Sequence, residues 1–167
     1  TLHLVFEAPH VMSSHKPARV LVLNGPKLNL LGVREPEIYG SLTLEALNAQ
    51  CEAAAQSLGL ELRFAQHNSE GALIDELHAS GNSDQGVVFN PGGYTHTSVA
   101  LHDAIRAIGI PVVEVHLSNI YKREDFRQRS VTGSACAGVI QGFGADSYRL
   151  ALHHLAGVLT TNAPDPA

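Results

Sequence analysis

The sequence predicts a single α/β domain built on a five-stranded parallel β-sheet with helices on both faces. Two observations predict this class. Short β-branched runs alternate along the chain with segments of helical period, and almost every position of those runs is apolar. Parallel strands need crossover connections, which the helical segments would provide, and strands covered on both faces are apolar on both sides.

Five runs are predicted to be strands, because each is short, rich in aliphatic residues and bounded by polar or glycine-containing segments. They are residues 19–23, 61–65, 86–90, 112–116 and 137–141. Five parallel strands joined by helices favour a flavodoxin-like three-layer sandwich with strand order 2-1-3-4-5.

A helix is predicted between the first two strands. Thr43 is a favourable N-cap, because its hydroxyl can accept a hydrogen bond from a free backbone N–H, and Gly59 suits the left-handed turn that ends a helix. Between them apolar residues recur at helical spacing, namely Leu44, Leu47, Cys51, Ala54, Ala55 and Leu58.

Three further helices are predicted from the same signals. The helix after the second strand begins at Ser69 or Asn68, and the helix after the third begins at Thr97 or Ser98 and is stopped by Gly109. Their apolar positions are Leu73, Ile74 and Leu77, then Leu101, Ile105 and Ile108, and on the last helix Tyr148, Leu152, Leu155 and Leu159.

One domain is expected to span residues 18–160, because no linker, repeat or low-complexity segment interrupts the alternation. Residues 1–17 show no clean period, and we interpret them as an N-terminal extension without function, in which Met12 is a candidate start of the natural chain. Residues 161–167 are expected to form a frayed C-terminal tail.

Composition excludes several functional classes. The net charge of −5 and the lack of a basic run disfavour nucleic-acid binding, and the short apolar runs disfavour a membrane span or a secretion signal. Only 16% of the 167 residues are charged, which suggests a homo-oligomer that buries part of its surface. Cys51 and Cys136, expected inside a helix and a strand, are interpreted as buried thiols of a cytoplasmic protein.

Three polar segments follow the carboxyl ends of predicted strands, where ligands bind in this architecture. They are residues 24–40, 90–98 and 116–127. The first is longer than most strand-to-helix connections and carries Arg34 and Tyr39. A tyrosine pKa near 10 leaves about one phenol in a thousand ionised at pH 7, so a nearby arginine would be needed to make Tyr39 a base. Alternatively, Tyr39 only anchors this loop.

Glu114 and His116 are expected on the same side of the fourth strand, because side chains alternate with a period of two. A carboxylate beneath an imidazole fixes its tautomer, which makes His116 a candidate general acid. A purely structural buried pair is the alternative. His96 precedes a helix start that suits an anion, and Arg123 and Arg127, four residues apart, could share one side of a helical turn and bind a carboxylate.

Metal and nucleotide chemistry are weaker interpretations. His96, His102 and His116 could meet at a metal, but the sequence contains neither His-Glu-x-x-His nor Cys-x-x-Cys. The glycine-rich segments match neither a phosphate-binding P-loop nor a dinucleotide-binding turn, so a flavin or nucleotide has little support.

Over residues 19–157 the chain resembles the type II 3-dehydroquinate dehydratases. The resemblance rests on ordered motifs at the spacing of that family. They are Leu23-Asn-Gly-Pro26, Leu30-Leu-Gly-Val-Arg-Glu-Pro36 with Tyr39-Gly40, Asn68-Ser-Glu-Gly71, Asn90-Pro-Gly-Gly-Tyr-Thr-His-Thr-Ser98, Glu114-Val-His-Leu-Ser-Asn119 with Arg123 and Phe126-Arg127, and Gly138-Val-Ile140.

The resemblance implies a dodecamer built as a tetramer of trimers and a cofactor-free, metal-free dehydration of 3-dehydroquinate to 3-dehydroshikimate. In the matching positions, Tyr39 is the base that removes a proton from C2, and Arg34 and Arg123 lie near it. His116, held by Glu114, protonates the departing C1 hydroxyl. The positions that match substrate contacts are Asn90, His96, Leu117 (through its backbone), Ser118 and Arg127, together with Asp103, which a neighbouring subunit contributes.

One position departs from the family pattern, because Lys27 stands where the family has asparagine. We expect an active enzyme in which the ammonium group changes the pH optimum. The alternative is a catalytically impaired paralogue that binds a cyclic carboxylate.

Overall fold

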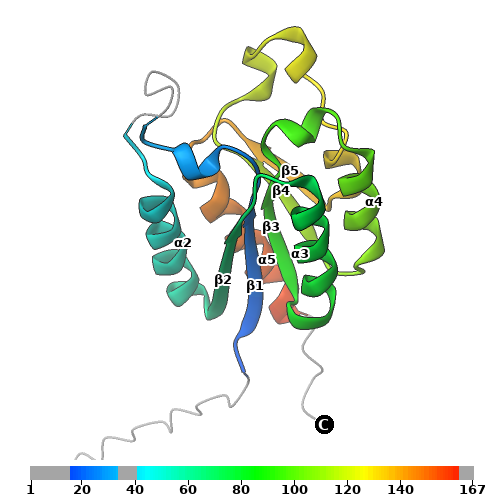
Figure 1. The fold of residues 1–167 in the computed structure, drawn as a ribbon. Helices are drawn as coiled ribbons and strands as arrows, with labels where there is room; N and C mark the ends of the chain where they lie inside the picture. The colour runs from blue at the N-terminus through cyan, green and yellow to red at the C-terminus, as the bar shows by residue number, and fades with distance from the viewer. Residues whose placement is uncertain (1–15, 34–40, 162–167) are drawn as a thin grey trace, which may run out of the picture.

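The computed structural model describes residues 16–33 and 41–161. Its sheet contains β1 (Ala18–Asn24), β2 (Leu60–Gln66), β3 (Gly86–Asn90), β4 (Val112–His116) and β5 (Gly138–Gln141). All strands are parallel and their order is β2-β1-β3-β4-β5, which confirms the predicted fold class (Figure 1).

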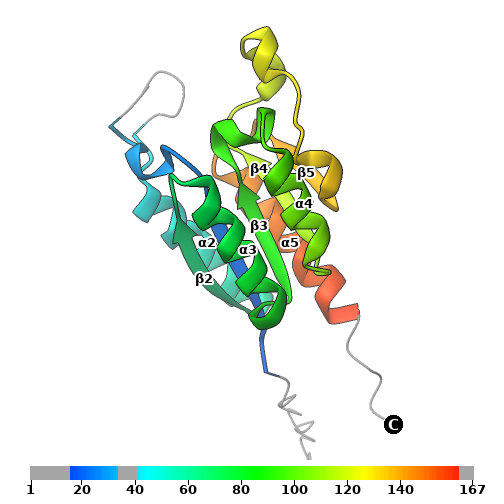
Figure 2. The same ribbon diagram turned by 45° about the vertical axis from the view of Figure 1, so that its right-hand side comes forward.

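Four α-helices complete the three layers. They are α2 (Leu44–Leu58), α3 (Glu70–Ser83), α4 (Val99–Ala107) and α5 (Asp146–Thr161). The helices α3 and α4 cover one face of the sheet, and α2 and α5 cover the other (Figure 1, Figure 2). Each face therefore has its own apolar core, which explains why the sheet residues are apolar on both sides.

The predicted helix ends agree with the structure. Thr43 Oγ1 accepts from Ala46 N at 3.1 Å, and Gly59 ends α2 with a φ of 68°. Ser98 caps α4 by accepting from Leu101 N at 2.9 Å. Ser69 precedes α3 without a side-chain cap bond.

One strand assignment needs correction. Cys136 lies before β5, at the end of a short 3₁₀ turn (Gly133–Ala135), and is half-buried rather than inside the strand. Cys51 is buried on α2 as expected, and both cysteines are free thiols. Burial raises the pKa of each to about 12, so both remain protonated at neutral pH.

The helices of the described ranges are all too short or too polar to cross a membrane.

Candidate active site

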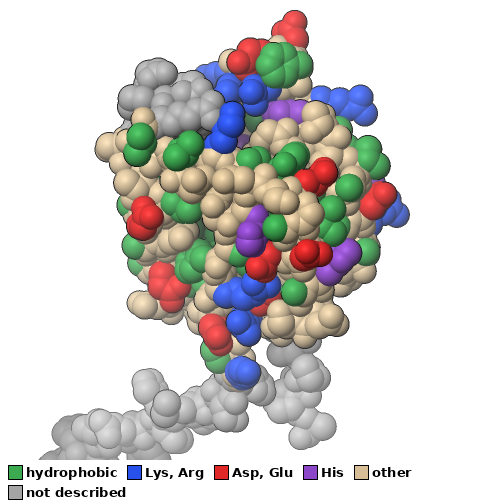
Figure 3. Space-filling view, in the orientation of Figure 1, with side chains coloured by type: hydrophobic (Ala, Val, Ile, Leu, Met, Phe, Trp, Pro, Cys, Tyr) green, Lys and Arg blue, Asp and Glu red, His purple; other side chains and the backbone are tan. Residues whose placement is uncertain are grey.

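A pocket of about 190 Å³ opens at the carboxyl ends of β1, β3 and β4. The loops predicted to converge do so here, and eight predicted site residues line the pocket. They are Lys27, Asn90, His96, His116, Leu117, Ser118, Arg123 and Arg127. Lys and Arg side chains gather at this end of the molecule (Figure 3). The pocket therefore suits an anionic ligand.

Glu114 and His116 meet as predicted, because both project from the same side of β4. His116 Nε2 lies 2.7 Å from Glu114 Oε1, and the Glu114 side chain is completely buried. A carboxylate can only accept this bond, so Nε2 carries a proton and Nδ1 is the atom available for proton transfer. His116 is itself only 7% exposed, which makes it part of the pocket floor.

Three hydroxyl groups that the sequence did not reveal also bind Glu114. Thr95 Oγ1 and Ser130 Oγ donate to Oε1 at 2.6 and 2.8 Å, and Thr132 Oγ1 donates to Oε2 at 2.5 Å. Burial alone would raise the pKa of Glu114. The bonds from His116, Thr132 and Thr95 and the charge of His116 outweigh it, so the pKa lies below its usual value.

Asn90 is held at the end of β3 by a buried network. Its Nδ2 donates to the Tyr148 hydroxyl at 2.8 Å, and that hydroxyl donates to Asn24 Oδ1 at 2.6 Å. Asn90 Oδ1 accepts from Gly92 N at 3.1 Å. The amide is thereby fixed in one orientation, and Asn24 and Tyr148 are positioning residues that the sequence did not identify.

The chain between β1 and the pocket requires a glycine. Gly25 N donates to Asn90 O at 2.7 Å, and a Cβ at Gly25 would lie 2.5 Å from the carbonyl oxygen of Pro91. No side chain fits at that distance. This close approach brings the loop after β1 to the edge of the pocket.

His96 ends a 3₁₀ turn (Gly92–His96) that follows β3. Its Nδ1 lies 2.7 Å from the backbone carbonyl oxygen of Arg129, which can only accept. Nδ1 therefore carries the proton, and Nε2 of the neutral ring is an acceptor for a ligand hydroxyl.

The two arginines after β4 differ from expectation. They do not share a helical turn, because Arg123 ends one 3₁₀ turn (Ile120–Lys122) and Arg127 ends another (Asp125–Arg127). Both still line the pocket and both pair with Glu124 Oε2, at 3.6 and 3.2 Å. Arg123 Nη1 also donates to Ser118 Oγ at 3.3 Å.

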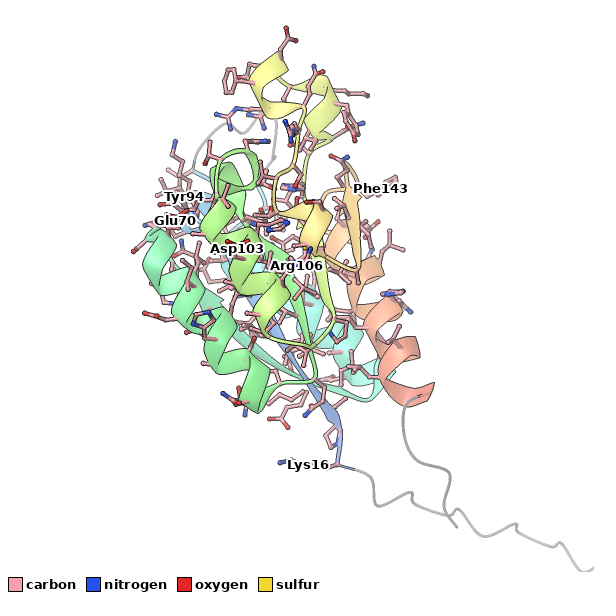
Figure 4. The ribbon with its side chains drawn as sticks, turned by 90° about the vertical axis from the view of Figure 1, so that its right-hand side faces the viewer. Lys16, Glu70, Tyr94, Asp103, Arg106 and Phe143 are labelled. Carbon is pink, nitrogen blue, oxygen red and sulfur yellow. The ribbon has the colours of Figure 1, made fainter. Side chains whose placement is uncertain are left out.

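Asp103 lies apart from these residues. It projects from α4, its side chain is 71% exposed, and it does not line the pocket of its own chain (Figure 4). Arg34 and Tyr39 lie outside the described residues. Within the ranges described, there is no group of three or more His, Cys, Asp or Glu side chains that could hold a metal ion.

Comparison with known proteins gives consistent matches. The model of the class II dehydroquinase family matches residues 18–156. A 3-dehydroquinate dehydratase of Rhizobium johnstonii is 57% identical over 139 residues, covering 83% of this chain and 96% of the relative. A 3-dehydroquinate dehydratase of Carboxydothermus hydrogenoformans is 54% identical over 149 residues, covering 89% of this chain and 97% of the relative. A type II dehydroquinase structure from Butyrivibrio crossotus has a TM-score of 0.82 and 41% identity, covering 84% of this chain and 99% of that chain.

Proposed function

Since this chain belongs to the class II dehydroquinase family, we propose the 3-dehydroquinate dehydratase reaction as the function of the pocket described above. The enzyme is a hydro-lyase that converts 3-dehydroquinate to 3-dehydroshikimate, in the shikimate pathway or in quinate breakdown. The observation that carries this function is the Glu114–His116 pair on the pocket floor, because it provides a proton donor that faces a cationic cavity.

The elimination proceeds through an enolate. Tyr39, as its phenolate, removes a proton from C2 of the substrate, with Arg34 and Arg123 stabilising the phenolate charge. His116 Nδ1 then gives a proton to the C1 hydroxyl, which leaves as water while the enolate electrons form the new double bond. Glu114 stabilises the imidazolium of His116 before the proton is transferred. It also fixes the orientation of the ring, because its carboxylate accepts a hydrogen bond from Nε2.

Substrate recognition follows from the remaining lining residues. The Asn90 amide, held by Tyr148, and the His96 imidazole, held by Arg129 O, are fixed hydrogen-bonding groups for the ring hydroxyls and the carboxylate. Ser118, the Leu117 backbone and Arg127 complete the contacts. These groups suit a small polar anion because they combine fixed dipoles with positive charge.

A homo-oligomer completes the site in this proposal. We infer a dodecamer, built as a tetramer of trimers, in which Asp103 of one chain reaches the substrate of a neighbour. The exposed position of Asp103 outside its own pocket supports this role. Exposed apolar side chains, including Val99 at the start of α4, provide surface for such contacts.

A single catalytic domain spans residues 18–160 and works without a cofactor or metal in the cytoplasm. Two free, partly or fully buried cysteines are consistent with a reducing compartment.

The test is to add 3-dehydroquinate to the purified protein with a chelator present and to follow the ultraviolet absorbance of the conjugated enone. Turnover is expected, and Tyr39→Phe is expected to abolish nearly all of it, because phenylalanine cannot accept the proton. Folded, oligomeric wild-type protein without turnover would contradict the function. A Tyr39→Phe variant with the wild-type rate would overturn the base assignment alone.

A further inference from the structure

Lys27 has an unusual backbone conformation. With a φ of 70°, it is the only non-glycine residue with a positive φ in the described part of the chain. A residue with a Cβ is disfavoured there, and such conformations persist only where the surrounding structure holds them. Because Lys27 lies in the pocket wall, the structure that holds it also shapes the pocket.

Two hydrogen bonds hold the Lys27 backbone. Its carbonyl accepts from Leu30 N at 3.0 Å, which is a bond within the same turn. Its amide donates to Asn68 Oδ1 at 3.0 Å, although Asn68 is 41 residues away along the chain. The Asn68 side chain is therefore the tertiary contact of this pair.

Asn68 is itself fixed by a neighbour at the end of β2 and by another in the 3₁₀ turn that follows β3. Gln66 Nε2 donates to the same Oδ1 at 3.1 Å, and the Tyr94 hydroxyl donates to the Asn68 backbone carbonyl at 3.0 Å. This bond places Tyr94 beside the start of α3 (Figure 4). Asn68 thus connects the loops that follow β1, β2 and β3.

Lys27 also brings a charge to the pocket. Within the described residues, its ammonium group has no carboxylate partner, whereas Arg123 and Arg127 both pair with Glu124. Lys27 comes from the β1 side and the two arginines from the β4 side. Cationic residues from two separate loops therefore line the pocket.

We propose that Asn68 is a positioning residue of the reaction, which acts by keeping Lys27, a cationic residue of the pocket wall, in its left-handed conformation. The proposal rests on the proposed function, because the charge to be balanced is the substrate carboxylate and the enolate formed from it. Asn68 does not line the pocket, and the bond to the Lys27 amide joins its side chain to a residue that does.

A double-mutant cycle tests this dependence. Asn68→Ala is expected to lower kcat/KM about tenfold, the scale of one lost hydrogen bond. Lys27→Gly loses the cation and also lowers kcat/KM, but glycine adopts the left-handed conformation unaided. Asn68→Ala is therefore expected to cause no further loss in the Lys27→Gly background.

The matched control is Asn29→Ala, because Asn29 Oδ1 accepts from the same Gln66 amide at 3.4 Å, whereas the Lys27 amide donates to Asn68. This variant is expected to keep the wild-type kcat/KM. An equal loss from Asn68→Ala in both backgrounds, or no loss in the wild-type background, would overturn the proposal. Urea titration of each variant shows whether a loss reflects unfolding.

A second measurement does not depend on catalysis. Hydrogen exchange at the Lys27 amide, in protein isotopically labelled at lysine, is expected to accelerate in Asn68→Ala and to stay unchanged in Asn29→Ala. Unchanged exchange of the Lys27 amide in Asn68→Ala would show that Asn68 does not hold Lys27, even if the enzyme is active. If wild-type protein shows no turnover, the proposed function fails, while the exchange rates still decide whether Asn68 holds Lys27.

Discussion

At the scale of single residues, Glu114 is a buried carboxylate that remains ionised. Its pKa is lower in the folded protein than the ordinary value of 4.5, because hydrogen bonds and the charge of His116 outweigh the effect of burial. The unfolded chain therefore binds the proton first as the pH falls. The stabilisation from Glu114 is fully present above pH 4.5 and is lost as the pH falls through the folded-state pKa.

Glu114→Gln is expected to remove this titration and to lower kcat roughly 100-fold, because a neutral amide supports an imidazolium poorly. The free energy of unfolding of the variant should then fall less steeply than that of the wild type below pH 4.5. Urea titrations at a series of pH values measure this slope. Parallel pH dependences for the two proteins would show that Glu114 does not titrate as inferred.

Lys27→Asn is expected to shift the pH optimum of kcat/KM upward, because the pocket loses a positive charge that favours the deprotonated form of a catalytic base. Asparagine also tolerates the left-handed conformation better than lysine, so stability should rise by up to about 1 kcal/mol. The pH–rate profile and a urea titration test the two effects separately. A profile identical to the wild type at every pH would make Lys27 a bystander.

The sequence predicted individual residues well where a period relates them. The two-residue alternation of a strand was enough to bring Glu114 and His116 together. No period relates Glu114 to Ser130 and Thr132, which reach it from an irregular segment after β4. Their contribution depends on tertiary folding and could not be predicted.

At the scale of elements, one hydroxyl links α5 to the ends of β1 and β3. Tyr148 is buried, and its hydroxyl both donates to Asn24 and accepts from Asn90. Burial also raises the pKa of this phenol, so it stays protonated and can donate at every working pH.

Tyr148→Phe is expected to destabilise the protein by about 1–3 kcal/mol, because the amides of Asn24 and Asn90 would each lose a buried partner. The KM for 3-dehydroquinate should rise as well, since Asn90 is no longer fixed. Urea titration and steady-state kinetics measure both. Tyr121→Phe, at a residue 65% exposed, is the control and should change stability by no more than about 0.5 kcal/mol. Equal effects of the two substitutions would contradict the network's role.

The regular elements were predicted more accurately than the loops between them. Apolar periods and the cap residues Thr43 and Gly59 located strands and helices to within a residue or two. The short 3₁₀ turns were not predicted, because three to five residues are too few to show a period. That is why Arg123 and Arg127 were placed on one turn, whereas the structure has two.

At the scale of the whole molecule, substitution of Asp103 tests whether the active site is shared between neighbouring chains. Asp103→Ala is expected to lower kcat/KM about tenfold or more, although the residue is absent from its own chain's pocket. Light scattering should give a mass close to twelve times the 17.8 kDa of one chain, for the variant and the wild type alike. A fully active monomer would contradict both inferences.

The hydrogen bonds of Tyr148 have a consequence for the synthesis of the protein. They join residues 124 and 58 positions apart, from the first strand to the last helix. A ribosome makes the chain from its N-terminus, so Asn24 and Asn90 are made before the tyrosine that fixes them. Until the last helix has left the exit tunnel, Asn90 lacks its partner. Substrate binding that depends on a fixed Asn90 therefore has to wait until α5 has been made and has packed against the sheet.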